Sequence, residues 1–149
     1  MLSNLKINKI HNVEYFGSER TDTTQTFGLY VFGNNELEQP YSVLTKRRLY
    51  TCLLYVKKYL KEEDLVAIYY DVLEGSNAGY LGFERLTADL NKKLFSKVLF
   101  CDLESVLQID YLHNQLFDLT RCVQNLEFFD LEGNLFQVDQ LPLNQLLGV

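Results

Sequence analysis

Two acidic residues stand at the junction of a buried strand and a helix in the stretch "KVLFCDLESVLQ", Lys97 to Gln108. The apolar run ends at Asp102, and Glu104 follows within the first turn of the expected helix. Open α/β sheets place their chemistry at the carboxyl ends of strands, so this junction is a candidate catalytic site. The helical segment that follows, Ser105 to Gln108, offers no cation, no general base and no strong nucleophile. The stretch therefore has the position of an active site in the fold but lacks the residue types that would catalyse a reaction there.

The residue types that bind metals or form covalent intermediates are scattered along the chain. The three cysteines, Cys52, Cys101 and Cys122, are far apart, and each lies in an apolar run. The two histidines, His11 and His113, are equally isolated. Because the chain has no CxxC and no paired-histidine spacing, we expect buried free thiols, no metal site and no cofactor.

The charge of the chain indicates what it binds. Its net charge is −6, from 14 basic and 20 acidic residues. An autonomous DNA-binding domain normally carries a basic patch, so we expect no independent DNA binding. The basic residues are densest at Lys46, Arg47 and Arg48, and at Lys57, Lys58 and Lys61 further along the same expected helix. A solvated helix face is our interpretation of this cluster, and a phosphate contact is the alternative.

Length and hydropathy favour one soluble domain. A chain of 149 residues, 47% of them hydrophobic, is long enough to bury a core. It contains no apolar run of about 18 residues, and its first residues lack the apolar stretch of a secretory signal. We therefore expect a cytoplasmic protein that does not enter a membrane.

Strands alternate with helices from Thr26 onward. Buried strands are expected at 26–33, 64–73, 96–103 and 125–132, and helices at 41–61, 83–94 and 105–123. The helix at 41–61 is expected to turn Leu49, Cys52, Val56 and Tyr59 toward the core. This order predicts an α/β domain over 26–149, with a three-layer, mostly parallel sheet of four to five strands flanked by helices. Residues 1–25 are interpreted as an N-terminal extension with one short strand at 10–16.

From Thr26 to Glu132, the order of elements and several strings resemble the N-terminal catalytic domain of serine recombinases, the resolvase and invertase family. The string "DVLEGSNAGYLGFERLTADL" is similar to an acidic, glycine-rich loop followed by an "R-P-G-F-x-R-L" helix start. The string "CDLESVLQ" resembles the family's "D-L-D-R-L-S-R" motif, and "LEFFDLEG" its "V-E-F-x-S-L-x-E" strand. The resemblance implies a resolvase-like sheet.

The same resemblance implies that the nucleophile is missing. In the family the first strand runs into "Y-x-R-V-S", where the serine attacks the DNA phosphate and the arginine helps to activate it. Here the matching stretch is "YVFGN", with Phe32 in the place of the arginine and Asn34 in the place of the serine. Asparagine cannot form the covalent phosphoester that a serine forms.

The cations of the family's site are also replaced. Tyr80 matches the arginine before the family's Pro-Gly-Phe, and Ser105 and Gln108 match the two arginines of the second motif, with Glu104 as the acid between them. Phosphoryl transfer depends on cationic stabilisation, and removal of one such donor typically lowers the rate by about 10²- to 10³-fold. We expect no catalytic residue at these positions. Glu104 is then explained by the helix dipole, and Asp102 by capping of the helix with its side chain.

We therefore interpret the chain as a catalytically inactive, serine-recombinase-like domain that acts as a binding or regulatory module. The resemblance implies a role in DNA recombination or a mobile element, with a second copy or another protein, such as an active recombinase, as the partner. One alternative is an active recombinase with a displaced site. Another is a nucleotide- or flavin-binding domain that uses the loops "FGNNELEQP" and "EGSNAGYLG", although neither is a dinucleotide fingerprint or a P-loop.

Overall fold

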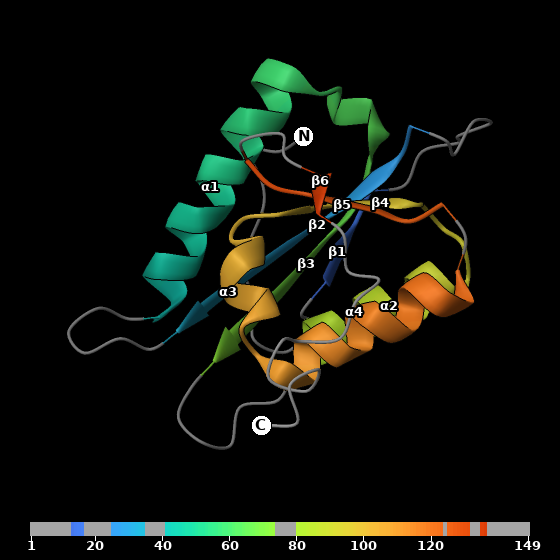
Figure 1. Ribbon diagram of the computed structural model, residues 1–149. Helices are drawn as coiled ribbons and strands as arrows, with labels where there is room; N and C mark the ends of the chain where they lie inside the picture. Colours follow the sequence, from blue (N-terminus) through green and yellow to red (C-terminus); the bar gives the residue numbers. More distant parts are fainter. Residues whose placement is uncertain are drawn as a thin grey trace.

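The described residues of the protein form a six-stranded sheet with helices on both faces (Figure 1). The computed structural model describes residues 13–16, 25–34, 41–73, 80–123, 125–131 and 135–136. The strands are β1 (Val13–Tyr15), β2 (Phe27–Asn34), β3 (Leu65–Leu73), β4 (Lys97–Phe100), β5 (Glu127–Phe129) and β6 (Leu135–Phe136). The helices are α1 (Tyr41–Tyr59), the 3₁₀-helix η2 (Glu62–Asp64), α2 (Leu81–Asn91), α3 (Leu103–Leu107) and α4 (Asp110–Cys122).

The order of strands is β1-β3-β2-β4-β5-β6. The four inner strands, β3, β2, β4 and β5, are parallel, whereas β1 and β6 are antiparallel to their neighbours. The expected α/β class with a mostly parallel sheet is confirmed. Within the described part of the chain the sheet has six strands, not the expected four to five, because a short antiparallel strand lies at each edge. One of these two strands, β1, comes from within residues 1–25.

The helices lie on opposite faces of the sheet, α1 on one face and α2, α3 and α4 on the other (Figure 1). Successive residues of β2 alternate between the two layers. Leu29 and Val31 belong to the cluster beneath α1, and Tyr30 belongs to the cluster beneath α2 and α4. Because both faces are covered, the inner strands are apolar almost without interruption, which is why the sequence located all four. The strands β4 and β5 are shorter than the expected 96–103 and 125–132, and α3 already begins at Leu103.

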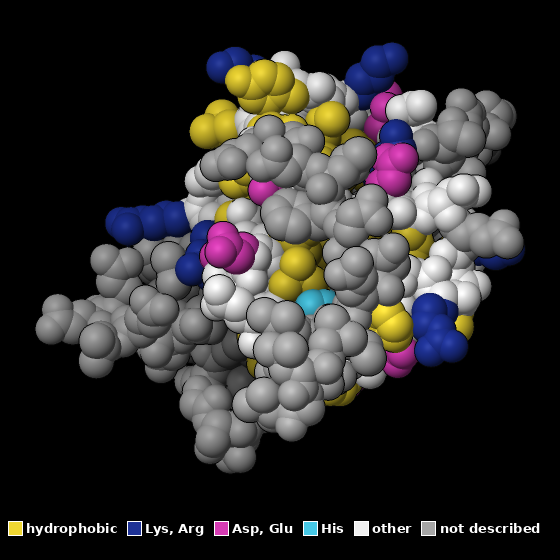
Figure 2. All heavy atoms as spheres, viewed as in Figure 1, with side chains coloured by type: hydrophobic (Ala, Val, Ile, Leu, Met, Phe, Trp, Pro, Cys, Tyr) yellow, Lys and Arg dark blue, Asp and Glu magenta, His cyan; other side chains and the backbone are white. Residues whose placement is uncertain are grey.

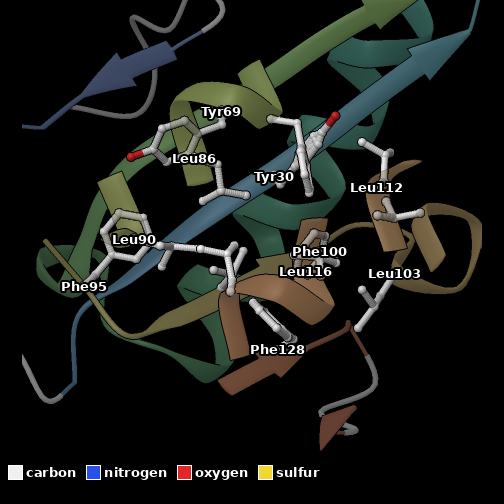
Figure 3. Packing of buried hydrophobic residues seen from close by; sticks show 14 of the residues in the cluster. Tyr30, Tyr69, Leu86, Leu90, Phe95, Phe100, Leu103, Leu112, Leu116 and Phe128 are labelled. Atoms are coloured by element: carbon white, nitrogen blue, oxygen red, sulfur yellow. The ribbon is translucent and has the colours of Figure 1, made fainter. Parts of the chain in front are cut away.

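The core beneath α2, α3 and α4 is rich in aromatic rings (Figure 3). Tyr30 lies at its centre, with its ring centroid 5.4 Å from that of Phe83 and 5.9 Å from that of Phe100. Gly28 makes room for this packing, because a Cβ atom there would lie 2.6 Å from the ring of Phe95. The rings therefore set how closely α2 approaches the sheet.

The helix expected at 105–123 is two helices, which corrects the prediction. The break lies at Ile109, whose backbone is extended, with φ −90° and ψ 110°. The chain changes direction at this residue, so that α3 buries Leu103 and Val106 and α4 separately buries Leu112 and Leu116. A single straight helix could not place both sets of side chains against the same sheet.

Candidate functional site

The topology marks one place where a ligand site is expected. The strand β2 is the first of the parallel strands in the sequence, and it lies between β3 and β4. The connections to β3 and then to β4 run in opposite directions across the sheet, through α1 and α2 on opposite faces. Doubly wound sheets bind ligands at the carboxyl ends of the strands where the order reverses in this way. In this protein that place is the carboxyl edge between β2 and β4.

At this edge β2 extends beyond its neighbour β4. Phe100, the last residue of β4, pairs with Tyr30, and the N–H of Cys101 donates to the carbonyl of Tyr30 at 3.3 Å. The rest of β2 continues beside β3, where Phe32 pairs with Asp71 and Asn34 pairs with Leu73. The backbone of Phe32 and Asn34 thus lies at the switch point, and their side chains lie outside the described part of the chain.

The helix α3 follows β4 directly, and Asp102 caps it, as the sequence predicted. Its Oδ1 accepts a hydrogen bond from the backbone N–H of Ser105 at 3.2 Å, and its Oδ2 accepts one from the Ser105 hydroxyl at 2.6 Å. The hydroxyl of Ser105 is therefore bound to the capping carboxylate. This arrangement stabilises the first turn of the helix, and among the described residues no hydrogen bond or ion pair joins a histidine or lysine to Ser105 or Asp102.

The remaining positions named by the resemblance take different surroundings. Tyr80 is half-buried before α2, and its ring stacks on that of Tyr111 in α4, with centroids 5.9 Å apart. Glu104, in α3, and Gln108, the residue that follows this helix, are both exposed. Within the described residues, no hydrogen bond or ion pair joins the side chains of Tyr80, Glu104 and Gln108 to one another.

The two loops proposed for a nucleotide lie largely outside the described residues, since 35–40 and 74–79 are not described. No group of three or more His, Cys, Asp or Glu side chains that could hold a metal ion is found among the residues that are described. In the same part of the chain, no helix is both long and apolar enough to cross a membrane.

A buried carboxylate that the sequence analysis did not identify lies close to this edge. Asp71, in β3, is fully buried. Its Oδ1 accepts the N–H of Gly82 at 2.7 Å, and its Oδ2 accepts the N–H of Phe83 at 2.9 Å and the hydroxyl of Tyr30 at 2.7 Å. Burial raises the pKa of Asp71, and the hydrogen bonds from Tyr30 and the two N–H groups oppose this shift.

Asp71 lies in the sheet but takes the role of the N-cap residue of α2. The residue before α2, Tyr80, makes no side-chain cap, and the carboxylate of Asp71 accepts the first N–H groups of the helix instead. Gly82 is needed for this approach, because a Cβ atom there would collide with the carbonyl of Tyr70. The sequence signal is a lone acid inside the apolar strand "LVAIYYDVL".

A second buried carboxylate joins α2 to the edge of the sheet. The Oδ2 of Asp89 accepts hydrogen bonds from the hydroxyls of Tyr69 in β3 and Tyr15 in β1, each at 2.6 Å. Burial and the Asp89 carboxylate raise the pKa of Tyr69, so its hydroxyl stays protonated as a donor. Like Asp71, this cluster holds elements in place, and it contains no nucleophile.

The cysteines lie in three different environments, so the expectation of buried thiols holds in part. All three are free, with Cys52 buried, Cys101 half-buried and Cys122 exposed. Cys122 is in the last turn of α4, where the helix face that it occupies points to solvent. The thiol of Cys101 lies at the switch point and donates to the carbonyl of Arg48 in α1, with an S···O distance of 3.8 Å.

The outward side of α1 is a further candidate binding surface. We define the α1 outer face by its exposed residues Arg47, Tyr50, Leu54, Lys57, Lys58 and Tyr59. Tyr50 is 55% exposed, Leu54 69% and Tyr59 62%. The prediction that Tyr59 faces the core is thus wrong, because the helix ends at this residue and its ring lies over that of Tyr55, with centroids 5.0 Å apart.

The charges of α1 differ from those of the whole chain. Lys46, Arg47, Arg48, Lys57 and Lys58 are the charged residues of α1, and all are basic, whereas the chain has a net charge of −6. Figure 2 shows hydrophobic side chains next to Lys and Arg side chains at the top of the molecule, where α1 ends in Figure 1. The sequence analysis identified the basic residues and missed the exposed apolar ones between them.

A pocket of about 430 Å³ adjoins the end of the α1 outer face. It lies between the last turn of α1 and the amino ends of β2, β4 and β5, opposite the switch point. Its apolar lining is Phe27, Tyr55, Tyr59, Leu60 and Phe129. Polar residues complete it, including Lys61 and Lys97, and the Nζ of Lys97 lies 3.8 Å from the Oε2 of Glu127.

No protein-family model, curated protein or solved structure matches the chain.

Proposed function

We propose that this chain is a non-catalytic binding module that docks an acidic protein partner on the α1 outer face and in the adjoining pocket. The observation that carries the proposal is the pair of exposed residues Tyr50 and Leu54, one helical turn apart with basic neighbours, together with the exposed Tyr59 at the end of the helix, on a chain of opposite net charge. Large exposed apolar side chains close together mark interaction sites, and aromatic residues are enriched at the centres of interfaces.

The pocket supports the same proposal. Interfaces draw most of their binding energy from a few anchors that fill well-packed pockets. The aromatic lining beside Tyr59 offers such a pocket for an apolar side chain of the partner, and the cations along α1 attract acidic side chains around it. The partner that this surface fits carries an apolar anchor surrounded by Asp and Glu.

The charge pattern favours a different protein over a second copy or DNA. Two copies that paired through α1 would place like charges against each other, because all the charged residues of the helix are basic. DNA would match the cations but not the exposed Leu54, which offers no contact to a phosphate. The net charge of −6 also opposes DNA binding.

The non-catalytic part of the proposal rests on the carboxyl edge of the sheet. The hydroxyl of Ser105 is bound to the capping carboxylate of Asp102, and non-cationic residues stand where the resemblance expects arginines. If the resemblance to serine recombinases reflects common descent, a protein of a recombination system or mobile element is the first class of partner to test. The support for that link is the likeness of the sequence strings.

The test compares three labelled probes by fluorescence anisotropy: an amphipathic helical peptide rich in Glu and Leu, polyglutamate, and duplex DNA. We expect the amphipathic peptide to bind most tightly, with an affinity that decreases with salt. In the Leu54→Ala protein its Kd should rise by about tenfold, equivalent to about 1.4 kcal/mol. Leu94→Ala is the matched control, because Leu94 is 42% exposed and lies outside α1.

Charge-reversed variants provide a second test of binding to the α1 outer face. Lys57→Glu with Lys58→Glu should abolish binding of the peptide, whereas the matched pair Lys92→Glu with Lys93→Glu, after α2, should leave it unchanged. Tightest binding to DNA, lost in the same variants, would show a phosphate-binding face instead. Equal binding by all the variants would remove α1 from the proposal.

A further inference from the structure

Two cysteines from adjacent layers of the fold, α1 and the sheet, lie in the same buried cluster near the switch point of the sheet. Cys52 comes from the inner side of α1, and Cys101 is the first residue after β4. Cys101 packs against the buried cluster beneath α1 to which Cys52 belongs. The Cys101 thiol also lies 3.8 Å from the carbonyl of Arg48, one turn before Cys52 on the same helix. Neither cysteine is in a disulfide.

The two thiols are not equivalent. Cys52 is fully buried among apolar side chains, and both its hydrogen bond to Cys101 and its burial raise its pKa. Cys101 is half-buried, and its pKa is lowered because the Cys52 thiol donates a hydrogen bond to its sulfur and the Arg48 guanidinium is nearby. The thiolate is the reactive form of cysteine, so Cys101 is the nucleophile of the pair.

We propose that Cys101 is an oxidation site for hydrogen peroxide and that Cys52 resolves the oxidised form by closing a disulfide between α1 and the end of β4. Access limits the first attack to Cys101, because Cys52 has no exposed surface. The packing of Cys101 against the turn of α1 between Arg48 and Cys52 provides the proximity that the second step needs.

The two steps balance with peroxide as the oxidant. The Cys101 thiolate attacks one peroxide oxygen, the O–O bond breaks, hydroxide leaves, and a sulfenic acid forms. Cys52 then loses its proton, its sulfur attacks the Cys101 sulfur, and the S–O bond breaks. The departing hydroxide takes up a proton, so two thiols are oxidised to one disulfide while one peroxide is reduced to two waters.

The experiment uses the full chain with Cys122→Ser, which removes the exposed thiol and leaves the core unchanged. After treatment with hydrogen peroxide, thiols are counted in denaturant and the mass is measured. We expect both thiols to disappear together, the mass to fall by two hydrogens, the protein to run as a monomer without reductant, and dithiothreitol to restore the thiols. Peptide mapping should find Cys52 linked to Cys101.

Single variants in the same background separate the two roles. In Cys52→Ala, the sulfenic acid on Cys101 should accumulate and be trapped by dimedone. In Cys101→Ala, the Cys52 thiol should survive peroxide in the folded protein. Added oxygen without a linked peptide, or disulfide-linked dimers in the Cys122→Ser protein, would overturn the proposal. Loss of Cys52 at an unchanged rate in Cys101→Ala would do the same. These readouts do not depend on the binding proposed for α1.

Discussion

The two faces of the sheet are built by different means. On the face of α2, two buried carboxylates join strands to the helix: Asp71 accepts the first N–H groups of α2, and Asp89 accepts the hydroxyls of Tyr15 and Tyr69. On the other face, the described inner residues of α1, such as Leu49, form an apolar layer with one cysteine. The fully buried carboxylates and the aromatic core thus lie on one face, and the exposed aromatic and basic residues of α1 lie on the other.

This difference indicates how stability and function are divided. A buried carboxylate with three donors tolerates little change, because every donor needs a partner. An apolar layer tolerates small shifts, and the outward side of its helix can change without disturbing the core. We therefore expect substitutions near α2 to affect folding and substitutions on the α1 outer face to affect binding.

The largest loss of stability is expected for Asp71→Ala. The change leaves the N–H groups of Gly82 and Phe83 and the hydroxyl of Tyr30 without their acceptor in a buried site. We expect the free energy of unfolding to fall by about 3–5 kcal/mol, as for other broken buried charge networks. Urea denaturation measures this, with the exposed Asp110→Ala as the control. A loss below about 1 kcal/mol would show that Asp71 does not anchor α2.

Substitutions in the apolar cores on the two faces of the sheet should lower the free energy of unfolding by similar amounts. Leu99→Ala removes a buried side chain from the layer beneath α1, and Leu86→Ala removes one from the core beneath α2 and α4. Each should lower the free energy of unfolding by about 2–5 kcal/mol. Urea denaturation of both proteins tests the comparison. A much smaller effect for Leu99 alone would show that the layer beneath α1 is loosely packed.

The titration of Asp71 should also make the difference in stability between the native protein and an Asp71 variant depend on pH, by a smaller amount. Burial raises the pKa of Asp71 in the folded protein above the ordinary value of 3.8. Its contribution to stability is therefore fully present below the unfolded-state pKa and is lost as pH rises through the folded-state pKa. Asp71→Asn lacks this contribution, so the stability gap between the native protein and the variant should narrow as pH rises from about 4.

The difference in the free energy of unfolding between the native protein and Asp71→Asn should shrink by about 1.4 kcal/mol for each unit by which the folded-state pKa of Asp71 is raised. Urea denaturation of both proteins across this pH range measures it. A gap that widens with pH would mean that the hydrogen bonds of Asp71 outweigh its burial.

The smallest effect on stability is expected on the α1 outer face. Leu54→Ala, or Lys57→Glu with Lys58→Glu, should change the free energy of unfolding by no more than about 0.5 kcal/mol, since these side chains are exposed. Thermal unfolding of each protein beside the native chain measures this. If these variants unfolded at much lower temperature, the face would be part of the fold, and loss of binding could not be attributed to it.

The sequence predicted a feature correctly where that feature depends only on residues close together along the chain. The continuous apolar runs located the inner strands, and Asp102 was recognised as a cap because its partner, Ser105, is three residues away. Leu99 in β4 and Ile68 in β3 are buried for the same reason. The break at Ile109 was missed because apolar residues lie on both sides of it and no Gly or Pro marks it. Only the need to cover one sheet with two helices makes the chain turn there.

The sequence by itself determined the alternation of strands and helices, the parallel sheet and the absence of arginines at the positions named by the resemblance. It did not predict that Asp71 holds α2, that Cys52 meets Cys101, or that Tyr59 faces solvent beside Lys58. Each of these depends on groups brought together by the crossing of the chain or by the end of a helix. The periodicity of apolar residues indicates which side of a helix or strand is buried. The arrangements above depend instead on which other element packs against that side, and only the tertiary structure decides which element it is.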